Sequence, residues 1–120
     1  MAVPNEREIF DFLNHQVALW NSGKRQEMTD LYRHYARDQL SIEYVGQPIG
    51  DGWKAFERMW DMHGGIVRSD IVEILVTGNE GACAMRNVRL ASGLFNPSIE
   101  LYRFEEGRLF IRYFYRVDTE

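Results

Sequence analysis

The stretch PSIELYRFEEGRLFIRYFYRV, residues 97–117, decides how the second half of the chain folds. Two sets of side chains alternate between opposite faces through residues 97–104 and again through 108–117, and the turn between them contains Gly107. Alternation with a period of two residues is typical of β-strands, and glycine readily adopts the positive φ that hairpin turns need. The stretch therefore predicts an antiparallel β-hairpin.

Glu100 lies in the middle of the first of these strands, and alternation places it on the same face as Tyr102 and Phe104. A carboxylate beside two aromatic rings is unfavourable unless it is paired, hydrated or protonated. One interpretation is an acid that faces a pocket. The other is an edge-strand acid that lies in water or forms a salt bridge with an arginine.

The rest of the chain predicts a second hairpin, a short strand and three helices. Residues 71–78 and 82–93 flank a turn, and residues 39–45 alternate as a short strand. Apolar side chains recur at helical spacing in three segments, 9–20, 28–35 and 53–63. Three helices followed by long antiparallel strands form an α+β layout, and a sheet that curls around the helices would enclose a pocket.

The composition argues against several classes of function. A chain of 120 residues is the size of one domain, and a net charge of −4 without a run of Lys or Arg argues against a nucleic-acid partner. One cysteine excludes an internal disulfide, and three dispersed histidines give no metal-site signal. No apolar run approaches the ~20 residues that cross a bilayer, and the N-terminus lacks the form of a signal peptide. We therefore expect a cytoplasmic protein with no membrane partner.

Four stretches, in this order, resemble the nuclear transport factor 2-like superfamily, which includes ketosteroid isomerase and the SnoaL-like polyketide cyclases. They are WNSG (20–23), LYRHYARDQLSIEY (31–44), GWKAFERMW (52–60) and PSIELYRFEEGRL (97–109). The resemblance covers nearly the whole chain and implies a single domain over residues 1–120. It implies a cone-shaped α+β barrel, in which three N-terminal helices pack on a curved, mainly antiparallel sheet. Members often pair through the outer face of the sheet, so it also implies a homodimer.

The family's isomerases are similar to this chain around two acids. Residues 99–104 resemble their strand motif, which places Glu100 where they keep a protonated acid that hydrogen-bonds the substrate oxygen. Residues 35–38 resemble a second motif, and counting on from it without a gap places Glu43 at their catalytic base. The resemblance therefore implies that both glutamates face one pocket.

Gln16 and Trp60 differ from the isomerase pattern, in which tyrosines stand at both positions. An amide donates a weaker hydrogen bond than a phenol and cannot supply a proton. The broader SnoaL-like grouping therefore fits better than ketosteroid isomerase itself. We expect Gln16 to orient the substrate, and Trp60 and Tyr102 to contribute to its binding.

The two glutamates suit proton transfer next to a carbonyl group, without a cofactor or a metal. That chemistry needs an ionised base and a donor that meets the developing enolate oxygen. The aromatic neighbours of Glu100 favour its neutral form, whereas Glu43 shares its face with Ser41 and lies just before a polar turn. We therefore expect Glu43 to be the base and Glu100 the donor.

Further candidate residues have two interpretations each. His63 ends the third helix beside tryptophans, where it either packs and caps the helix or acts as a base. Arg86 and Asn87 lie on opposite faces of their strand, whose pattern leaves open which face lines the pocket. Either residue could bind the substrate, while Arg89 and Arg112 are expected on the outer face, paired with acids.

The sequence favours an acid–base enzyme that acts on a hydrophobic, carbonyl-bearing small molecule. Isomerisation, cyclisation and dehydration all fit, and a polyketide- or steroid-like substrate is implied by the resemblance alone. The main alternative is a non-catalytic ligand-binding or dimerisation module of the same fold, because the aromatic and arginine side chains of the last strand suit an interface. Epoxide hydrolysis is a third alternative, which Arg86 keeps open.

Overall fold

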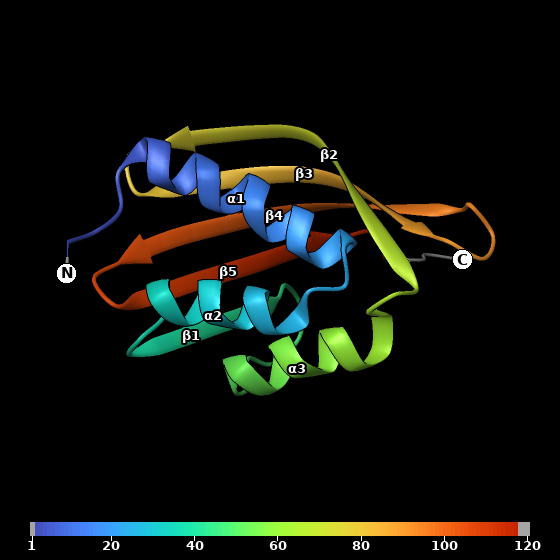
Figure 1. The fold of residues 1–120 in the computed structure, drawn as a ribbon, viewed down its shortest axis with the longest axis horizontal. Helices are drawn as coiled ribbons and strands as arrows, with labels where there is room; N and C mark the ends of the chain where they lie inside the picture. Colours follow the sequence, from blue (N-terminus) through green and yellow to red (C-terminus); the bar gives the residue numbers. More distant parts are fainter. Residues whose placement is uncertain (1, 118–120) are drawn as a thin grey trace.

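The computed structural model describes residues 2–117, which form three helices and one five-stranded sheet (Figure 1). In chain order the elements are α1 (Glu6–Asn21), α2 (Arg25–Tyr35), β1 (Gln39–Tyr44), α3 (Gly52–His63), β2 (Val67–Thr77), β3 (Glu80–Arg89), β4 (Phe95–Glu105) and β5 (Arg108–Tyr115). The predicted α+β class and its order of elements are confirmed. None of the helices in this range is long and apolar enough to cross a membrane.

The strands lie in the order β1-β5-β4-β3-β2, with β1 and β5 parallel and the other pairs antiparallel. Both predicted hairpins are present, since β2 pairs with β3 and β4 pairs with β5. Glu100 lies opposite Cys83 on one side and opposite Tyr113 on the other. Its strand is therefore in the interior of the sheet, which excludes the interpretation of Glu100 as an edge-strand acid.

The three helices cover one face of the sheet, here called the inner face (Figure 1). Alternate residues of β4 and β5 point to this face and are buried, among them Tyr102, Phe104, Leu109 and Ile111. α1 packs on β2 and β3, and α3 packs on β1. The hydrophobic core lies between these layers, and the sheet extends beyond it toward the β3–β4 turn.

Polar contacts fix the C-terminal end of α1 against the beginning of β2. The side-chain amide of Asn21 donates a hydrogen bond to the carbonyl oxygen of Ser69 at 2.8 Å and accepts one from its backbone N–H at 2.9 Å. The indole N–H of Trp20 donates to the carbonyl oxygen of Val67 at 3.0 Å. These three bonds hold Trp20 and the first residues of β2 together on the inner face.

A close backbone approach fixes α3 against β1. Asp51 caps the helix by accepting a hydrogen bond from the backbone N–H of Lys54 at 3.0 Å. A Cβ atom at Gly52 would collide with the carbonyl oxygen of Leu40, so glycine is needed where the helix meets the strand. From this contact the helix runs to His63.

β2 begins four residues before the predicted strand, at Val67. A β-bulge between Ile71 and Glu73 changes the phase of its alternation. The inward-facing positions before the bulge are therefore out of step with those after it, which is why the sequence pattern indicated only the later part. The added segment matters because it brings Val67 and Ser69 to the inner face.

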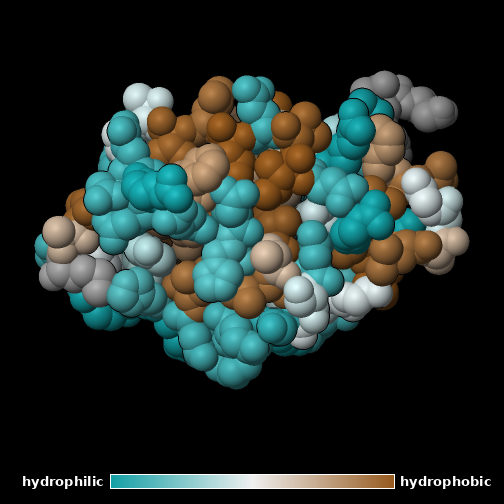
Figure 2. Space-filling view, turned by 45° about the horizontal axis from the view of Figure 1, so that its top comes forward, coloured by the Kyte–Doolittle hydropathy of each residue, from teal (hydrophilic) through white to brown (hydrophobic). Residues whose placement is uncertain are grey.

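The opposite face of the sheet, here called the outer face, carries apolar side chains among arginines. Leu75, Ile99 and Phe114 are exposed there, and the guanidinium group of Arg112 lies 5.3 Å from the ring centre of Phe114. Figure 2 shows the molecule from another side, where hydrophobic surface again gathers into patches between hydrophilic regions. The exterior of the described chain is therefore not uniformly polar.

Candidate functional site

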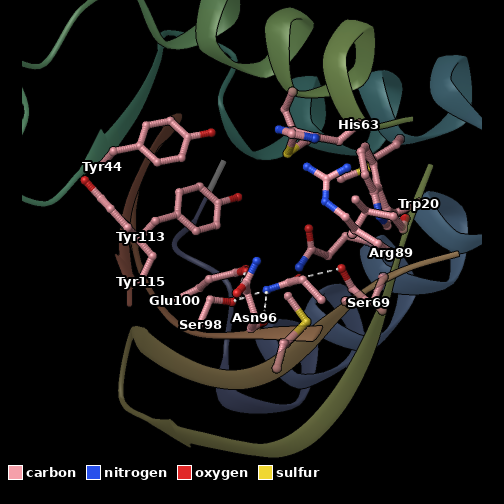
Figure 3. Close-up of a pocket in the computed structure, with 17 residues that line it drawn as sticks. Trp20, Tyr44, His63, Ser69, Arg89, Asn96, Ser98, Glu100, Tyr113 and Tyr115 are labelled. Atoms are coloured by element: carbon pink, nitrogen blue, oxygen red, sulfur yellow. Dashed lines mark hydrogen bonds between the residues drawn. The ribbon is translucent and has the colours of Figure 1, made fainter. Parts of the chain in front are cut away.

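A cavity of about 260 Å³ lies on the inner face of the sheet, beneath the helices (Figure 3). Its apolar lining includes Val17, Trp20, Met28, Met59, Val67 and Met85. Its polar lining includes Gln16, His63, Asn87, Arg89, Ser98 and Glu100. A mainly apolar wall with a few polar groups is typical of small-molecule sites, whose volumes are usually ~300–1,000 Å³. The cavity is slightly smaller than that range, which favours a compact ligand.

Glu100 is the one carboxylic acid among the residues that line the cavity. Its carboxyl group is buried, with 5% of the residue exposed. The Tyr102 hydroxyl donates a hydrogen bond to Oε1 at 2.6 Å, and the Ser98 hydroxyl donates to Oε2 at 3.4 Å. Burial raises the pKa of Glu100 from 4.5 to about 7, although the two hydrogen bonds lower it in part. At neutral pH both protonation states are populated, which suits general acid–base catalysis.

Gln16 and Tyr32 extend the hydrogen bonding behind Tyr102. The amide nitrogen of Gln16 donates to the Tyr102 hydroxyl at 3.0 Å, and the Tyr32 hydroxyl donates to the amide oxygen of Gln16 at 2.6 Å. All three side chains are buried. The series orients Tyr102 so that its own proton points at Glu100.

A second series of hydrogen bonds reaches Glu100 from the neighbouring strands (Figure 3). The Ser69 hydroxyl donates to the amide oxygen of Asn87 at 2.9 Å, and the amide nitrogen of Asn87 donates to the Ser98 hydroxyl at 2.9 Å. Ser98 then donates to Glu100. Both series therefore end on Glu100 as the acceptor, so hydrogen bonding favours its ionised form while burial opposes it.

Tyr44 and Tyr113 form a second wall of the cavity. Their rings stack with centroids 5.2 Å apart and planes 21° from parallel. Figure 3 shows both hydroxyl groups pointing into the cavity. Burial, followed by the charge of Glu100, raises the pKa of each hydroxyl above its ordinary value. Both groups therefore stay protonated at neutral pH and can donate hydrogen bonds to a ligand.

His63 and Arg89, here called the basic rim, line the cavity on its other side. Figure 3 shows the imidazole and guanidinium groups on the same side of the cavity, across from Tyr44 and Tyr113. The expectation that His63 contributes to the pocket therefore agrees with its position.

Glu43 lies outside the cavity, so the prediction that it is a base beside Glu100 is wrong. Leu40 and Ile42 point inward from β1 and are buried, and alternation then turns Glu43 to the outer face. There Arg112 donates a hydrogen bond from Nε to the Glu43 carboxylate at 3.0 Å. The expectation that Arg112 pairs with an acid on the outer face is confirmed.

The two arginines of β3, Arg86 and Arg89, lie on opposite faces of the sheet. Arg86 points outward, 5.4 Å from the ring centre of Phe95, so its predicted contact with the substrate is wrong. Asn87 and Arg89 line the cavity, so the expectation that Arg89 lies on the outer face is also wrong. The strand keeps its alternation, and the inner face is simply the one that contains Asn87.

The remaining predicted binding residues fall into two groups. Gln16 lines the cavity, as expected. Trp60 and Tyr102 are buried behind the lining, so the predicted direct contact with the substrate is not supported for either. Trp60 packs on Trp20, with ring centroids 4.4 Å apart, and Tyr102 is connected to the cavity through its hydrogen bonds with Glu100 and Gln16.

Tyr44 and Tyr113 are the main site residues that the sequence analysis missed. Each continues an inward alternation, after Ile42 in β1 and after Ile111 in β5. Tyr113 was interpreted with the other aromatic residues of the last strand as part of the core or of an interface, and Tyr44 was given no role. The available signal is a polar-tipped aromatic residue at the end of an apolar alternation. Such a position is where a strand runs past the packed core to a cavity.

Several solved structures share this architecture over nearly the whole chain. An NTF2-like protein of unknown function from Burkholderia xenovorans is 15% identical, with 97% of this chain and 88% of that chain covered and a TM-score of 0.72. Bal32a, from a soil-derived mobile gene cassette, is 17% identical, with 92% and 90% covered and a TM-score of 0.71. A Jannaschia protein provisionally named a SnoaL-like polyketide cyclase is 15% identical, with 93% and 88% covered and a TM-score of 0.66. This chain has the nuclear transport factor 2-like fold.

The nuclear transport factor 2-like fold confirms the architecture that the sequence resemblance implied. No protein-family model matches the sequence, and no curated protein matches it significantly. At identities of 11–17% the structural likeness establishes the fold alone. Within residues 2–117, no three or more His, Cys, Asp or Glu side chains are grouped to hold a metal ion.

Proposed function

We propose that the protein is a cofactor-independent acid–base enzyme that isomerises a compact, hydrophobic molecule carrying a carbonyl group. One observation carries the proposal: the cavity contains a single buried carboxyl group, Glu100, whose pKa is raised by burial to about 7. A general base is most effective when its pKa is close to the working pH. One structural neighbour is provisionally named a polyketide cyclase, which agrees with chemistry at a carbonyl group.

Glu100 is the base in the proposed reaction, because both series of hydrogen bonds donate to it. Its carboxylate takes a proton from the carbon next to the substrate carbonyl. The hydroxyl groups of Tyr44 and Tyr113 donate hydrogen bonds to the carbonyl oxygen, on which negative charge develops. The proton then returns from Glu100 to a different carbon, which completes an isomerisation without a second base.

His63 offers a second route in the same cavity, in which its imidazole is the base and neutral Glu100 is the acid. The two routes differ in the sign of their pH dependence. With Glu100 as the base, kcat/KM rises as the pH increases through about 7, because only the carboxylate accepts a proton. With Glu100 as the acid, kcat/KM falls over the same range.

Deuterium exchange at the carbon next to the carbonyl tests the proposal without knowledge of the natural substrate. We expect the wild-type protein to accelerate exchange on at least one member of a panel of small cyclic ketones and enones, followed by NMR. Glu100→Gln keeps the shape of the side chain but removes the base, and should slow exchange by about 10²–10⁴-fold.

Glu43→Gln is the matched control, since Glu43 is paired with Arg112 outside the cavity. It should leave the exchange rate unchanged. Equal exchange rates in wild type and Glu100→Gln would contradict the proposed role of Glu100. A panel on which the wild-type protein accelerates nothing would favour the alternative of a binding module.

A non-catalytic small-ligand-binding module remains the alternative, because the apolar lining of the cavity suits ligand binding by itself. Epoxide hydrolysis loses the observation that favoured it, because Arg86 lies on the outer face. Pairing of two copies through the outer face and a cytoplasmic location stay predictions. Sedimentation of the purified protein tests the first, and a monomer at all concentrations would contradict it.

A further inference from the structure

The basic rim is held in place by backbone hydrogen bonds between two turns. The N–H of Leu90 donates to the carbonyl oxygen of Ile66 at 3.0 Å, and the N–H of Ile66 donates to the carbonyl oxygen of His63 at 3.0 Å. Arg89 is the last residue of β3, and its carbonyl oxygen accepts a hydrogen bond from the N–H of Gly93 at 2.7 Å, across the β3–β4 turn. These backbone hydrogen bonds therefore hold His63 and Arg89 at the same rim of the cavity.

Arg89 differs from most arginines of the protein in having no carboxylate within ion-pair distance among residues 2–117. Seven other arginines in that range each lie within 4.0 Å of an acid. The only acid that lines the cavity is Glu100, which is satisfied by Tyr102 and Ser98. In a protein with a net charge of −4, the cavity thus presents an uncompensated positive charge at its rim.

We propose that Arg89 binds a carboxylate of the ligand, so that the substrate is a small hydrophobic acid that also carries the reacting carbonyl group. The inference rests on the proposed function for the position of that carbonyl at Glu100. The carboxylate lies at the basic rim, where the guanidinium group donates two parallel hydrogen bonds and the His63 imidazole lies beside it. The hydrophobic body of the substrate fills the cavity between Trp20 and the methionines.

The register of the sheet sets the spacing between the two ends of the substrate. Cys83 is the partner of Glu100 across the β3–β4 pair, and Arg89 is six residues further along the same face of β3. Six residues of strand span ~20 Å, so the two residues are attached to the sheet at well-separated points. A small acid with several bonds between its carboxylate and its reacting carbon therefore fits better than one in which the two groups are adjacent.

A carboxylate fits the rim better than a phosphate. Phosphate sites commonly combine several cations or a helix N-terminus with free backbone N–H groups. Here a single guanidinium group supplies the charge, and α3 presents its C-terminal end at His63, which is the negative end of the helix dipole. One planar fork of donors matches a planar monoanion.

The test compares pairs of probes that differ only in charge: phenylacetate, phenylpropanoate and phenylpentanoate, each with its neutral primary amide. Affinities are measured by calorimetry, with the intrinsic tryptophan fluorescence, to which Trp20 at the cavity wall contributes, as a second readout. We expect the wild-type protein to bind the longer acids about tenfold or more tightly than their amides, the usual gain from a charge-assisted hydrogen bond. Arg89→Gln should reduce this preference to less than about twofold.

Arg86→Gln is the matched control, since Arg86 is three residues earlier on the same strand and points outward. It should retain the full preference for the acids. Arg89→Lys, which keeps the charge but loses the planar fork, should retain part of it. Circular dichroism establishes that each variant is folded.

Three results would overturn the inference. They are equal binding of acid and amide by the wild-type protein, a preference for the acid that survives Arg89→Gln, and no binding of any of the acids. Because no turnover is measured, failure here is distinguishable from failure of the proposed reaction. Exchange on neutral ketones without a preference for acids would retain Glu100 as the base and reject the carboxylate site. A preference for acids that depends on Arg89 and persists in Glu100→Gln, without any exchange activity, would retain the carboxylate site and reject Glu100 as the base.

Discussion

Glu43 and Glu100 lie on strands that flank the same neighbour, β5, yet their surroundings are opposite. Glu43 is paired across the strands with Arg112, and Glu100 is paired with Tyr113, the next residue of β5. Alternation turns consecutive residues to opposite faces, so one acid points outward to a guanidinium group and the other points inward to a cavity. The partners of the two acids are consecutive residues of β5, yet one acid forms a surface ion pair and the other is the candidate catalytic base.

The comparison shows that neighbouring charges and burial act on a carboxyl group in opposite directions. Glu43 meets a cation in a partly exposed setting, with 24% of its side chain accessible. Glu100 meets no cation in the described chain, and burial raises its pKa to about 7 against the opposing effect of two hydrogen bonds. The ionised form of Glu100 therefore lowers the stability of the fold, while a pKa close to neutral suits proton transfer. Perturbed pKa values of this kind often occur at functional sites.

The sharpest test of this comparison is the free energy of unfolding of Glu100→Gln, measured once below pH 4.5 and once above pH 7. A raised pKa means that the folded state binds the proton more tightly than the unfolded chain does. The stabilising contribution is fully present below pH 4.5 and is lost as the pH rises through about 7. We expect the substitution to stabilise the fold by up to about 3 kcal/mol at high pH and to have little effect near the lower limit.

Urea unfolding at the two pH values measures this difference. Glu43→Gln, the control on the outer face, should change the free energy of unfolding by less than about 1 kcal/mol. A stabilisation by Glu100→Gln that is equal at both pH values would contradict the buried-acid interpretation. It would indicate an effect of shape or packing instead.

Tyr102→Phe gives the next largest expected effect, because it removes the 2.6 Å hydrogen bond to Glu100. A hydrogen bond to a charged group contributes ~1.5–3 kcal/mol, so its loss should raise the pKa of Glu100 by about one unit or more. NMR titration of the labelled carboxyl group measures the shift. Tyr35→Phe, whose hydroxyl is outside this series, should leave the pKa of Glu100 unchanged.

An unchanged pKa of Glu100 in Tyr102→Phe would mean that the hydroxyl proton is not directed at the carboxylate. A lowered pKa would mean that Glu100 donates to Tyr102 in the neutral form. The experiment therefore separates the role of base from the role of acid. It does so without a substrate.

The fold was accessible from the sequence because each element has its own local signal. The hairpin at 97–117 shows alternation on both sides of a glycine turn, and the three helices show apolar spacing. β2 was predicted too short because its signal is interrupted by the bulge between Ile71 and Glu73. Local periodicity fails where the backbone itself changes phase.

The site was less accessible because it depends on which face of each strand is covered. The resemblance of residues 99–104 to a family motif placed Glu100 at the cavity, where it lies, while Glu43 was placed by counting on from a second motif without a gap. The buried Ile42, one residue earlier, contradicts that count, since consecutive residues cannot share a face. Arg89 was misplaced because a charged side chain at the rim of a cavity has the same local pattern as one on the outer face.

The smallest expected effect concerns the pair of Glu43 and Arg112 on the outer face. With 24% and 48% of the two side chains accessible, solvent screens the interaction, and a double-mutant cycle of Glu43→Gln with Arg112→Gln should give a coupling of ~0.2–1 kcal/mol. The coupling should decrease in high salt, whereas the pH-dependent effect of Glu100→Gln should change little, because buried groups are screened much less. Urea unfolding of the four variants at low and high salt measures both. A coupling of several kcal/mol that resisted salt would mean that this pair is buried, for example against a second copy of the chain. Glu43 would then be exposed to solvent in the isolated subunit only, and the difference in burial between Glu43 and Glu100 would disappear in the assembly.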